Sequence, residues 1–167
     1  IDAIAELRAG GHNVRLRIIG KGRDESLARA RAAELGLESN AVEFLGYIES
    51  HADALKIVGG SDIGLIPHRN CELWNTTIPN KLFDYMAAGL PVLTSDAEPC
   101  ARIVRETGAG TAFQSGAGGE IAKGVIRLSA PGVAEACGTA GRTAIRSRYN
   151  WEHDTNVFEE VLFRAAR

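Results

Sequence analysis

Short apolar runs alternate with amphipathic helical segments along most of this chain, and this alternation restricts the fold more than any other feature. The runs LRIIG, DIGLIP and LPVLTS are predominantly apolar rather than alternating in polarity, which is typical of parallel strands buried on both faces. Strands separated by helices with short links form right-handed βαβ units. The sequence therefore predicts an α/β fold: a doubly wound, Rossmann-like parallel sheet of five or six strands with helices on both faces.

The boundaries of the elements follow from the same pattern. Strands are predicted at 14–19, 41–48, 62–67, 91–95 and 110–113. The intervening periodicity predicts helices at 24–37, 51–61, 79–88 and 99–108, followed by helices at about 117–130, 132–148 and 151–166. Asp24 is predicted to cap the first of these helices, and Gly36 to end it.

Composition limits the class of protein. With 167 residues, 45% of them apolar, and a net charge of −2, the chain has the size and core of one soluble domain spanning 1–167. A near-neutral chain without a basic cluster is not expected to bind nucleic acid. No apolar run approaches the roughly 20 residues that a membrane span requires. Because the chain starts in helical periodicity without a methionine, we interpret it as a fragment of a longer protein.

The cysteines and one sequon also bear on the compartment. Cys71, Cys100 and Cys137 are odd in number and widely spaced, which fits reduced thiols in a cytoplasmic protein better than a disulfide frame or a zinc site. Asn75 opens an Asn-Thr-Thr sequon, which we interpret as a chance match.

Ligands of doubly wound sheets lie beyond the carboxyl ends of the strands, where helix N-termini point at them. The longest segment at these ends is 68–80, which contains Trp74. Long loops in compact domains are usually functional or disordered. Because predicted structure flanks this segment on both sides, we expect it to form the binding site.

The residues that follow give this site a chemistry. Unpaired amides at the start of the helix 79–88, with the positive end of its dipole, favour an anion the size of phosphate. Thr76, Thr77 and Asn80 supply further hydrogen bonds, and Lys81 supplies charge unless it points outward. Asp84 lies one helical turn after Asn80. A carboxylate there repels phosphate but accepts hydrogen bonds from a ribose diol. A phosphate site at the start of the helix and a ribose site at Asp84 together predict a nucleotide-binding site. The alternative is an ordinary crossover helix with a solvated Asp84.

Two further candidates are less specific. Gly20 and Gly22 follow the first strand, but Glu25 stands where the dinucleotide fingerprint has its third glycine, so a bare turn competes with a ligand contact. His68 follows the third strand and is either a ligand contact or a structural residue. The remaining histidines have no metal spacing, and the chain has no P-loop, nucleophile elbow or carboxylate pair suited to hydrolysis.

The order of these segments resembles the C-terminal half of the group 1 (family 4) glycosyltransferases, retaining enzymes with the GT-B fold. The likeness covers nearly the whole chain. Its most specific part is PNKLFDYMAAGLPVLTSD, and the other matching segments are VRLRIIGKGRDESLARARAAELGLESNAVEFLGYI, SDIGLIPHR and YNWEHDTNVFEEV.

The resemblance implies a hexosyltransferase that carries a sugar from a nucleotide-sugar donor, UDP- or GDP-linked, to a glycan or lipid-linked acceptor, without a metal or cofactor. It implies that this half binds the donor. Asp84 would hold the ribose diol, the amides near Thr77 and Ile78 would meet the diphosphate, and Gly46, Tyr47 and Ile48 would lie by the base. Thr76 stands where the family has the glutamate that meets the donor sugar, so it and Lys81 are the candidate catalytic residues.

The resemblance also identifies parts that this chain lacks. The family's donor half begins with a strand and a loop that supply a phosphate-binding arginine and lysine, and an acceptor half precedes it; neither is expected here. The isolated fragment would therefore turn over little. The parent would act in the cytoplasm, peripheral to the inner membrane, in making polysaccharide or glycolipid.

Two other functions stay open at this point. A nucleotide-sugar 2-epimerase shares the fold, but its catalytic acids and bases are not found. A flavodoxin-like binding or signalling domain would show an acidic cluster at the early strand ends, where this chain has Gly20 and Gly46.

Overall fold

The computed structural model describes residues 1–38, 40–116 and 119–165. Contacts divide the chain into two compact units. Unit 1 consists of Ile1–Ile57 and Ala117–Lys123, and unit 2 consists of Val58–Gly116 and Gly124–Arg167. Each unit contains its own parallel strands and its own hydrophobic cluster.

Unit 1 is built on a pair of parallel strands. Its elements are α1 (Asp2–Ala9), β1 (Leu16–Ile19), α2 (Glu25–Glu34), β2 (Val42–Gly46) and most of α3 (His51–Gly59). Leu16 pairs with Val42, and the register shifts between Ile18 and Ile19 so that Ile19 pairs with Gly46. The two backbones stay paired beyond the shift, since the Gly20 amide donates to the Gly46 carbonyl at 2.7 Å.

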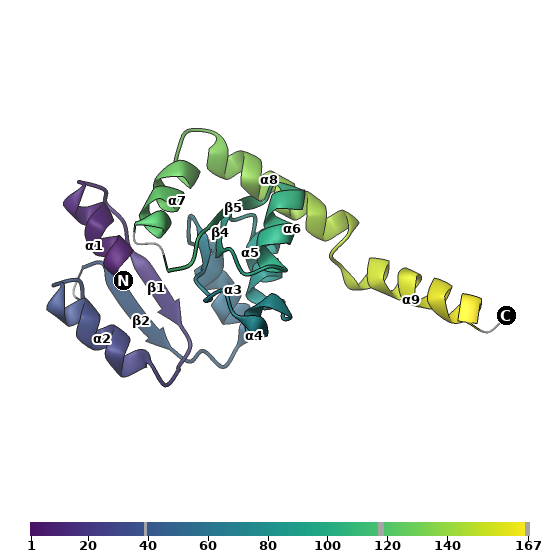
Figure 1. The fold of residues 1–167 in the computed structure, drawn as a ribbon, viewed down its shortest axis with the longest axis horizontal. Coiled ribbons are helices and arrows are strands. Elements are labelled where there is room, and N and C mark those ends of the chain that lie inside the picture. The colour runs from purple at the N-terminus through teal and green to yellow at the C-terminus, as the bar shows by residue number, and fades with distance from the viewer. Residues whose placement is uncertain (39, 117–118, 166–167) are drawn as a thin grey trace. The chain divides into compact units, whose positions relative to one another are not determined.

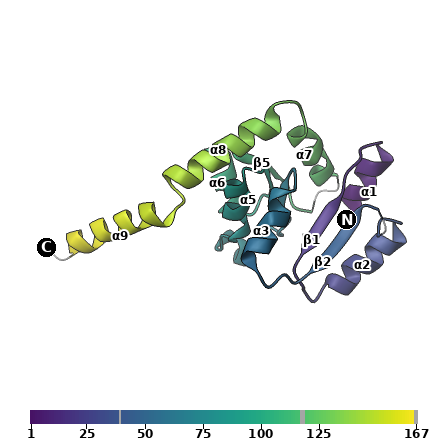
Figure 2. The ribbon, with the colours of Figure 1, turned by 180° about the vertical axis from the view of Figure 1, so that it is seen from behind.

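One hydrophobic cluster holds unit 1 together. Ile4 of α1, Ala32 of α2 and Val42 of β2 are buried in it. Because α1 and α2 share this cluster, their polar faces also meet, and Arg31 forms an ion pair with Asp2 at 2.6 Å. Figures 1 and 2 show β1 and β2 running side by side, with α1 and α2 next to them.

Unit 2 is built on three parallel strands. Its elements are β3 (Gly64–Ile66), α4 (Glu72–Asn75), α5 (Lys81–Ala88), β4 (Val92–Ser95), α6 (Cys100–Thr107), β5 (Gly110–Phe113), α8 (Val133–Ser147) and α9 (Trp151–Ala165), while α7 (Glu120–Leu128) belongs partly to each unit. The strand order is β3-β4-β5. All four residues of β4 are buried, as expected of a central parallel strand.

Helices cover both faces of β4. Val92 belongs to the large cluster of unit 2, which α5 and α6 complete with residues such as Leu82 and Ile103. Leu93, which points to the opposite face, meets α7 so closely that a Cβ on Gly124 would lie 2.5 Å from its Cδ1. The prediction of a doubly wound arrangement is thus confirmed within this unit.

The C-terminal end of α5 is fixed by a close approach to α8. Gly89 ends α5 in the left-handed conformation, with φ +76°. Its carbonyl oxygen lies so near α8 that a Cβ on Gly138 would stand 2.1 Å away. Only glycine permits this contact, which locks one end of the helix that carries Asp84.

The predicted elements are confirmed, β5 with the predicted bounds and the others with shorter ones, and five strands are present in the described residues. The predicted helix residues 117, 118 and 166 lie outside the described residues. The strands pair as two ladders, β1-β2 and β3-β4-β5, where the sequence predicted one sheet. Within the described chain, β1 and β3 each have a strand partner on one edge only.

Two features of unit 2 differ from a simple βα repeat. The sequence placed 68–80 in a loop, but the structure forms the four-residue helix α4 within it, which is too short to give a periodic signal. α9 extends away from the rest of unit 2 (Figure 1) and exposes large apolar side chains that include Trp151, Phe158 and Phe163. In the described part of the chain, no helix combines the length and the apolarity that crossing a membrane demands.

Candidate functional site

Three loops meet at the carboxyl ends of the strands of unit 2. The amide of Asn70, in the loop after β3, donates to Ser115 Oγ after β5 at 3.2 Å. The Ser115 amide donates to Asp96 Oδ1 after β4 at 3.1 Å. Asn70 Nδ2 closes the triangle on the Asp96 carbonyl at 3.4 Å. These bonds hold the ends of all three strands in one polar cluster.

Asn75 completes this cluster. Its Nδ2 donates to Asn70 Oδ1 at 2.8 Å, and its Oδ1 accepts from the Glu98 amide at 2.9 Å. We call Asn70, Asn75, Asp96 and Ser115 the tip network. Both side-chain groups of Asn75 are thus engaged within the chain.

The segment 76–80 runs from the tip network to α5. Its members Thr76, Thr77, Ile78 and Asn80 are exposed. The Thr76 hydroxyl lies 3.1 Å from the carbonyl oxygens of both Glu72 and Leu73, so its hydrogen caps α4. If Thr76 contacts a sugar hydroxyl, it therefore does so as an acceptor.

The start of α5 has the features of an anion site. Asn80 is the N-cap residue and makes no side-chain cap bond. Among the described residues, no acceptor is found for the amides of Thr77, Ile78, Asn80 and Lys81. The adjacent helical residue Leu82 is completely buried. Unpaired donors at the positive end of a firmly anchored helix favour a negatively charged group.

Asp84 lies on the side of α5 opposite the core. Leu82 and Met86, both fully buried, are two residues before and after it, so at about 100° per residue the carboxylate faces away from their cluster. Asp84 is nonetheless only partly exposed. Its neighbour Tyr85 packs against Gly64 of β3; burial raises the pKa of that phenol, and the negative charge of Asp84 adds to the effect.

The positive charge of Lys81 acts on the His68 side chain. The His68 ring stacks on Trp74, with ring centroids 3.6 Å apart and planes 17° apart. Partial burial lowers the pKa of His68, and the charge of Lys81 lowers it further. Lys81 also acts on Cys100 at the start of α6, whose pKa burial raises. Although the Lys81 side chain is exposed, its charge thus lowers the pKa of a residue after β3, His68, and of a residue after β4, Cys100.

The lowered pKa of His68 predicts a pH dependence. Because the unfolded chain binds this proton more readily, the His68 contribution to stability is complete above the ordinary histidine pKa of about 6.5 and is lost as the pH falls below it. We expect wild type to lose more unfolding free energy than His68→Phe between pH 7.5 and 5.5, by less than about 1 kcal/mol since the ring is half-buried. Chemical denaturation at both pH values measures this, and equal losses in the two proteins would contradict it.

The residues predicted to lie near the nucleotide base, together with the glycine turn after β1, belong to unit 1. The Gly20 amide donates to the Gly46 carbonyl at 2.7 Å just beyond the β1–β2 ladder, and both glycines have positive φ, +119° and +68°. Gly22 lies two residues further along an exposed turn. After Gly46, Tyr47 is 68% exposed and Ile48 is half-buried. The two strand ends are thus adjacent, with the Gly20 amide and the Gly46 carbonyl bonded to each other.

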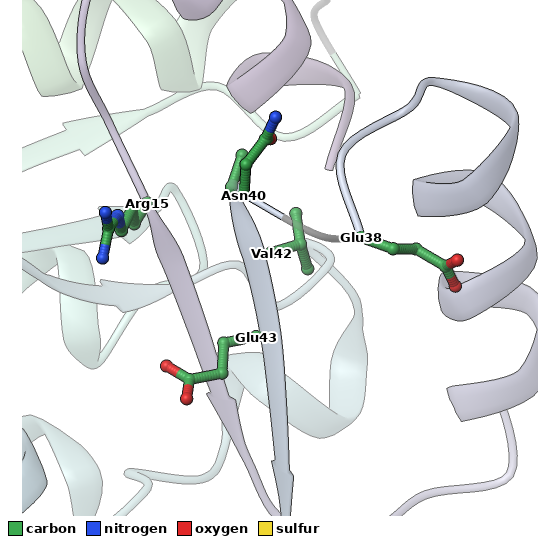
Figure 3. Close-up of a pocket in the computed structure, with 6 residues that line it drawn as sticks. Arg15, Glu38, Asn40, Val42 and Glu43 are labelled. Carbon is green, nitrogen blue, oxygen red and sulfur yellow. The ribbon is translucent and has the colours of Figure 1, made fainter.

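A separate pocket opens at the other end of unit 1. Arg15, Asn40 and Glu43 are among its lining residues, and its volume is about 370 Å³ (Figure 3). These residues lie at the amino ends of β1 and β2, opposite the ends expected to bind a ligand. In the described ranges, no group of three or more His, Cys, Asp and Glu side chains is placed to hold a metal ion.

The sequence reasoning missed the tip network and the partner of His68. The segments after β4 and β5, which contain Asp96 and Ser115, are visible in the sequence as polar stretches that follow apolar runs. Because the carboxyl ends of parallel strands lie at one edge of a sheet, these segments are expected to be neighbours. The individual hydrogen bonds were not visible, because they depend on loop conformation.

Comparison with known proteins agrees with this architecture. The family model "Glycosyl transferases group 1" matches residues 1–130. A phosphatidyl-myo-inositol mannosyltransferase of Mycobacterium leprae is 29% identical over 152 residues, which are 90% of this chain and 38% of that protein.

Solved structures give the same fold at lower identity. Sucrose-phosphate synthase of Thermosynechococcus elongatus superposes with a TM-score of 0.79 at 18% identity, over 98% of this chain and 42% of its own. HepE of Anabaena, solved in complex with UDP-glucose, superposes with a TM-score of 0.74 at 17% identity, over 98% of this chain and 44% of its own. The chain thus spans about two fifths of these relatives.

Proposed function

Because this chain belongs to the group 1 glycosyltransferases and has the Rossmann-like fold of the C-terminal half of GT-B enzymes, we propose that it binds the sugar donor of such a transferase. The observation that carries the proposal is the start of α5: unpaired amides of Thr77, Ile78, Asn80 and Lys81, with Asp84 one turn further on. This arrangement suits a diphosphate followed by a ribose.

The donor in this proposal is a UDP-hexose, and the acceptor is a glycan or a lipid-linked glycan. The mannosyltransferase relative and the UDP-glucose complex of HepE support a nucleotide-linked hexose. The base would lie against the backbone of 46–48 in unit 1, where Gly20 and Gly22 form the neighbouring turn. Cytoplasmic action at the inner membrane belongs to the same proposal.

The mechanism proposed is retention of the anomeric configuration on one face of the sugar, with family 4 enzymes as the model. The acceptor oxygen bonds to the anomeric carbon as the bond from that carbon to the diphosphate breaks, and the proton of the acceptor hydroxyl passes to the departing diphosphate. The amides of α5 and the charge of Lys81 stabilise the departing diphosphate without a metal ion. Thr76 orients the sugar by accepting from one of its hydroxyls, and His68, neutral at pH 7, lines the phosphate side.

Activity of the whole enzyme requires more than this chain. A second half would bring the acceptor and the basic residues that the family places before the donor strands. The chain alone is therefore expected to bind donor weakly and to show little turnover.

Calorimetric titration with UDP, GDP, ADP and TDP tests the proposal. We expect UDP to bind at least about tenfold more tightly than uridine, a difference of ~1.4 kcal/mol, because the diphosphate meets the amides of α5. The absence of any response to the four diphosphates, in both the chain and the intact enzyme, would refute donor binding.

A further inference from the structure

All residues of the donor-binding segment 76–80 except Pro79 are exposed, yet the geometry of the segment must be maintained for its amides to converge on one diphosphate. Loops without such support move readily, and a displacement of about 1 Å at a binding site is costly. Two anchors flank this segment: Asn75 precedes it, and the fully buried Leu82 follows it. The second anchor is apolar, whereas the first depends entirely on hydrogen bonds.

We propose that Asn75, acting through Asn70, Asp96 and Ser115, is a positioning residue that holds the donor-binding amides of Thr77, Ile78 and Asn80 at the carboxyl ends of the strands of unit 2. The proposal rests on the donor-binding function inferred above. It assigns the tip network a role in affinity, without contact between Asn75 and the donor.

Asn75 is chemically suited to this task because its side chain bridges two loops. Its amide group donates to Asn70 at 2.8 Å, while its oxygen accepts the Glu98 amide at 2.9 Å. An aspartate would keep the acceptor but lose the donor. An alanine would lose both and leave the Glu98 amide without its partner.

Asp96 joins the third loop to the same cluster. Its carboxylate accepts the Ser115 amide at 3.1 Å, and its carbonyl accepts Asn70 Nδ2. The hydrogen bonds from Ser115 hold the pKa of Asp96 below its ordinary value, with a smaller contribution from Asn70. The carboxylate is therefore charged at neutral pH, which strengthens the bond to the loop after β5.

The network forms a closed set of contacts rather than a row of pairs. Asn75 contacts Asn70, and Asn70 contacts both Ser115 and Asp96. Replacing Asn75 should therefore alter the hydrogen bonds of Ser115, although the two residues are not in contact. Groups coupled in this way give non-additive effects when they are replaced together.

The experiment compares Asn75→Ala, Ser115→Ala and the double variant with wild type and with Gln114→Ala. Gln114 is exposed, adjacent to Ser115 and outside the network, so it is the matched control. Affinities are measured for UDP, inorganic pyrophosphate and uridine, and amide hydrogen exchange is measured without ligand.

We expect Asn75→Ala to weaken UDP and pyrophosphate binding by roughly tenfold each, the effect of losing one or two hydrogen bonds, and to leave uridine binding unchanged. The double variant should be little worse than Asn75→Ala alone. Exchange at the Ser115 amide should accelerate in Asn75→Ala, while Gln114→Ala behaves as wild type. A loss of general stability would instead weaken all three ligands together.

Two results would overturn the inference separately from the proposed function. If wild type binds UDP and Asn75→Ala binds it equally well, donor binding stands and the positioning role fails. If Ser115 exchange does not change in Asn75→Ala, the network does not act as a unit, whatever the protein binds. If wild type binds no nucleotide, the proposed function fails and the inference fails with it.

Discussion

Replacing Asp84 with alanine is expected to weaken UDP binding by roughly 30- to 100-fold, which corresponds to ~2–3 kcal/mol. The reason is that a ribose diol donates two hydrogen bonds to one carboxylate, and bonds to charged groups are stronger than neutral ones. Asp84→Asn keeps one acceptor and removes the charge, so its loss should be intermediate. Isothermal titration calorimetry of the three proteins measures the series.

A sharper form of this experiment varies the ligand as well. Wild type should prefer UDP to 2′,3′-dideoxy-UDP, and Asp84→Ala should bind the two equally, because the diol then has no carboxylate to meet. The difference between the preferences of wild type and Asp84→Ala for UDP over the dideoxy analogue measures the interaction of the Asp84 carboxylate with the ribose diol. An equal preference in both proteins would show that Asp84 does not contact the diol.

The change of net charge needs its own control. Glu135 is an exposed carboxylate in the first turn of α8. Glu135→Ala removes the same charge as Asp84→Ala from unit 2, and we expect it to leave UDP affinity unchanged. Melting temperatures of all variants separate lost binding from lost folding.

Much of the fold could be predicted because its strands and helices obey local rules. β4 was visible as part of a predominantly apolar run, and all four of its residues are buried. α5 was visible from its amphipathic pattern and from Gly89, which ends it at positive φ. Such signals depend on near neighbours in sequence, so a single chain is enough to show them.

The pairing of strands could not be predicted in the same way. The register between β1 and β2, including the shift after Ile18, arises from contacts distant in sequence. The pattern that predicted one sheet says which segments become strands and not which edges meet. Two ladders are therefore compatible with the same sequence pattern.

The candidate site likewise contains residues that local sequence patterns indicate and residues that they do not. Asp84 and the amides before it were identified from their helical spacing, because a helix fixes the direction of every residue in it. The tip network and the stack of His68 on Trp74 were not, since their partners lie in loops whose conformation no local pattern determines.

The second large effect concerns the anchor of α5. Leu82 is 0% exposed in the main cluster of unit 2, and Leu82→Ala is expected to destabilise the unit by about 3 kcal/mol through lost burial and an unfilled cavity. For a chain of this length that corresponds to a fall in Tm of roughly 6–12 °C. Guanidinium denaturation followed by tryptophan fluorescence is suited to this measurement, because Trp74 and Trp151 both belong to unit 2.

Leu27 offers the matched control, since it is 71% exposed on α2 and Leu27→Ala should change stability by less than about 0.5 kcal/mol. The Leu82 amide also bonds the Pro79 carbonyl at 3.0 Å, so a loosened Leu82 should move the start of α5. UDP affinity should consequently fall in Leu82→Ala even at temperatures where the protein is folded. A variant that is destabilised but binds UDP normally would show that the amides of Thr77, Ile78, Asn80 and Lys81 do not form the diphosphate site.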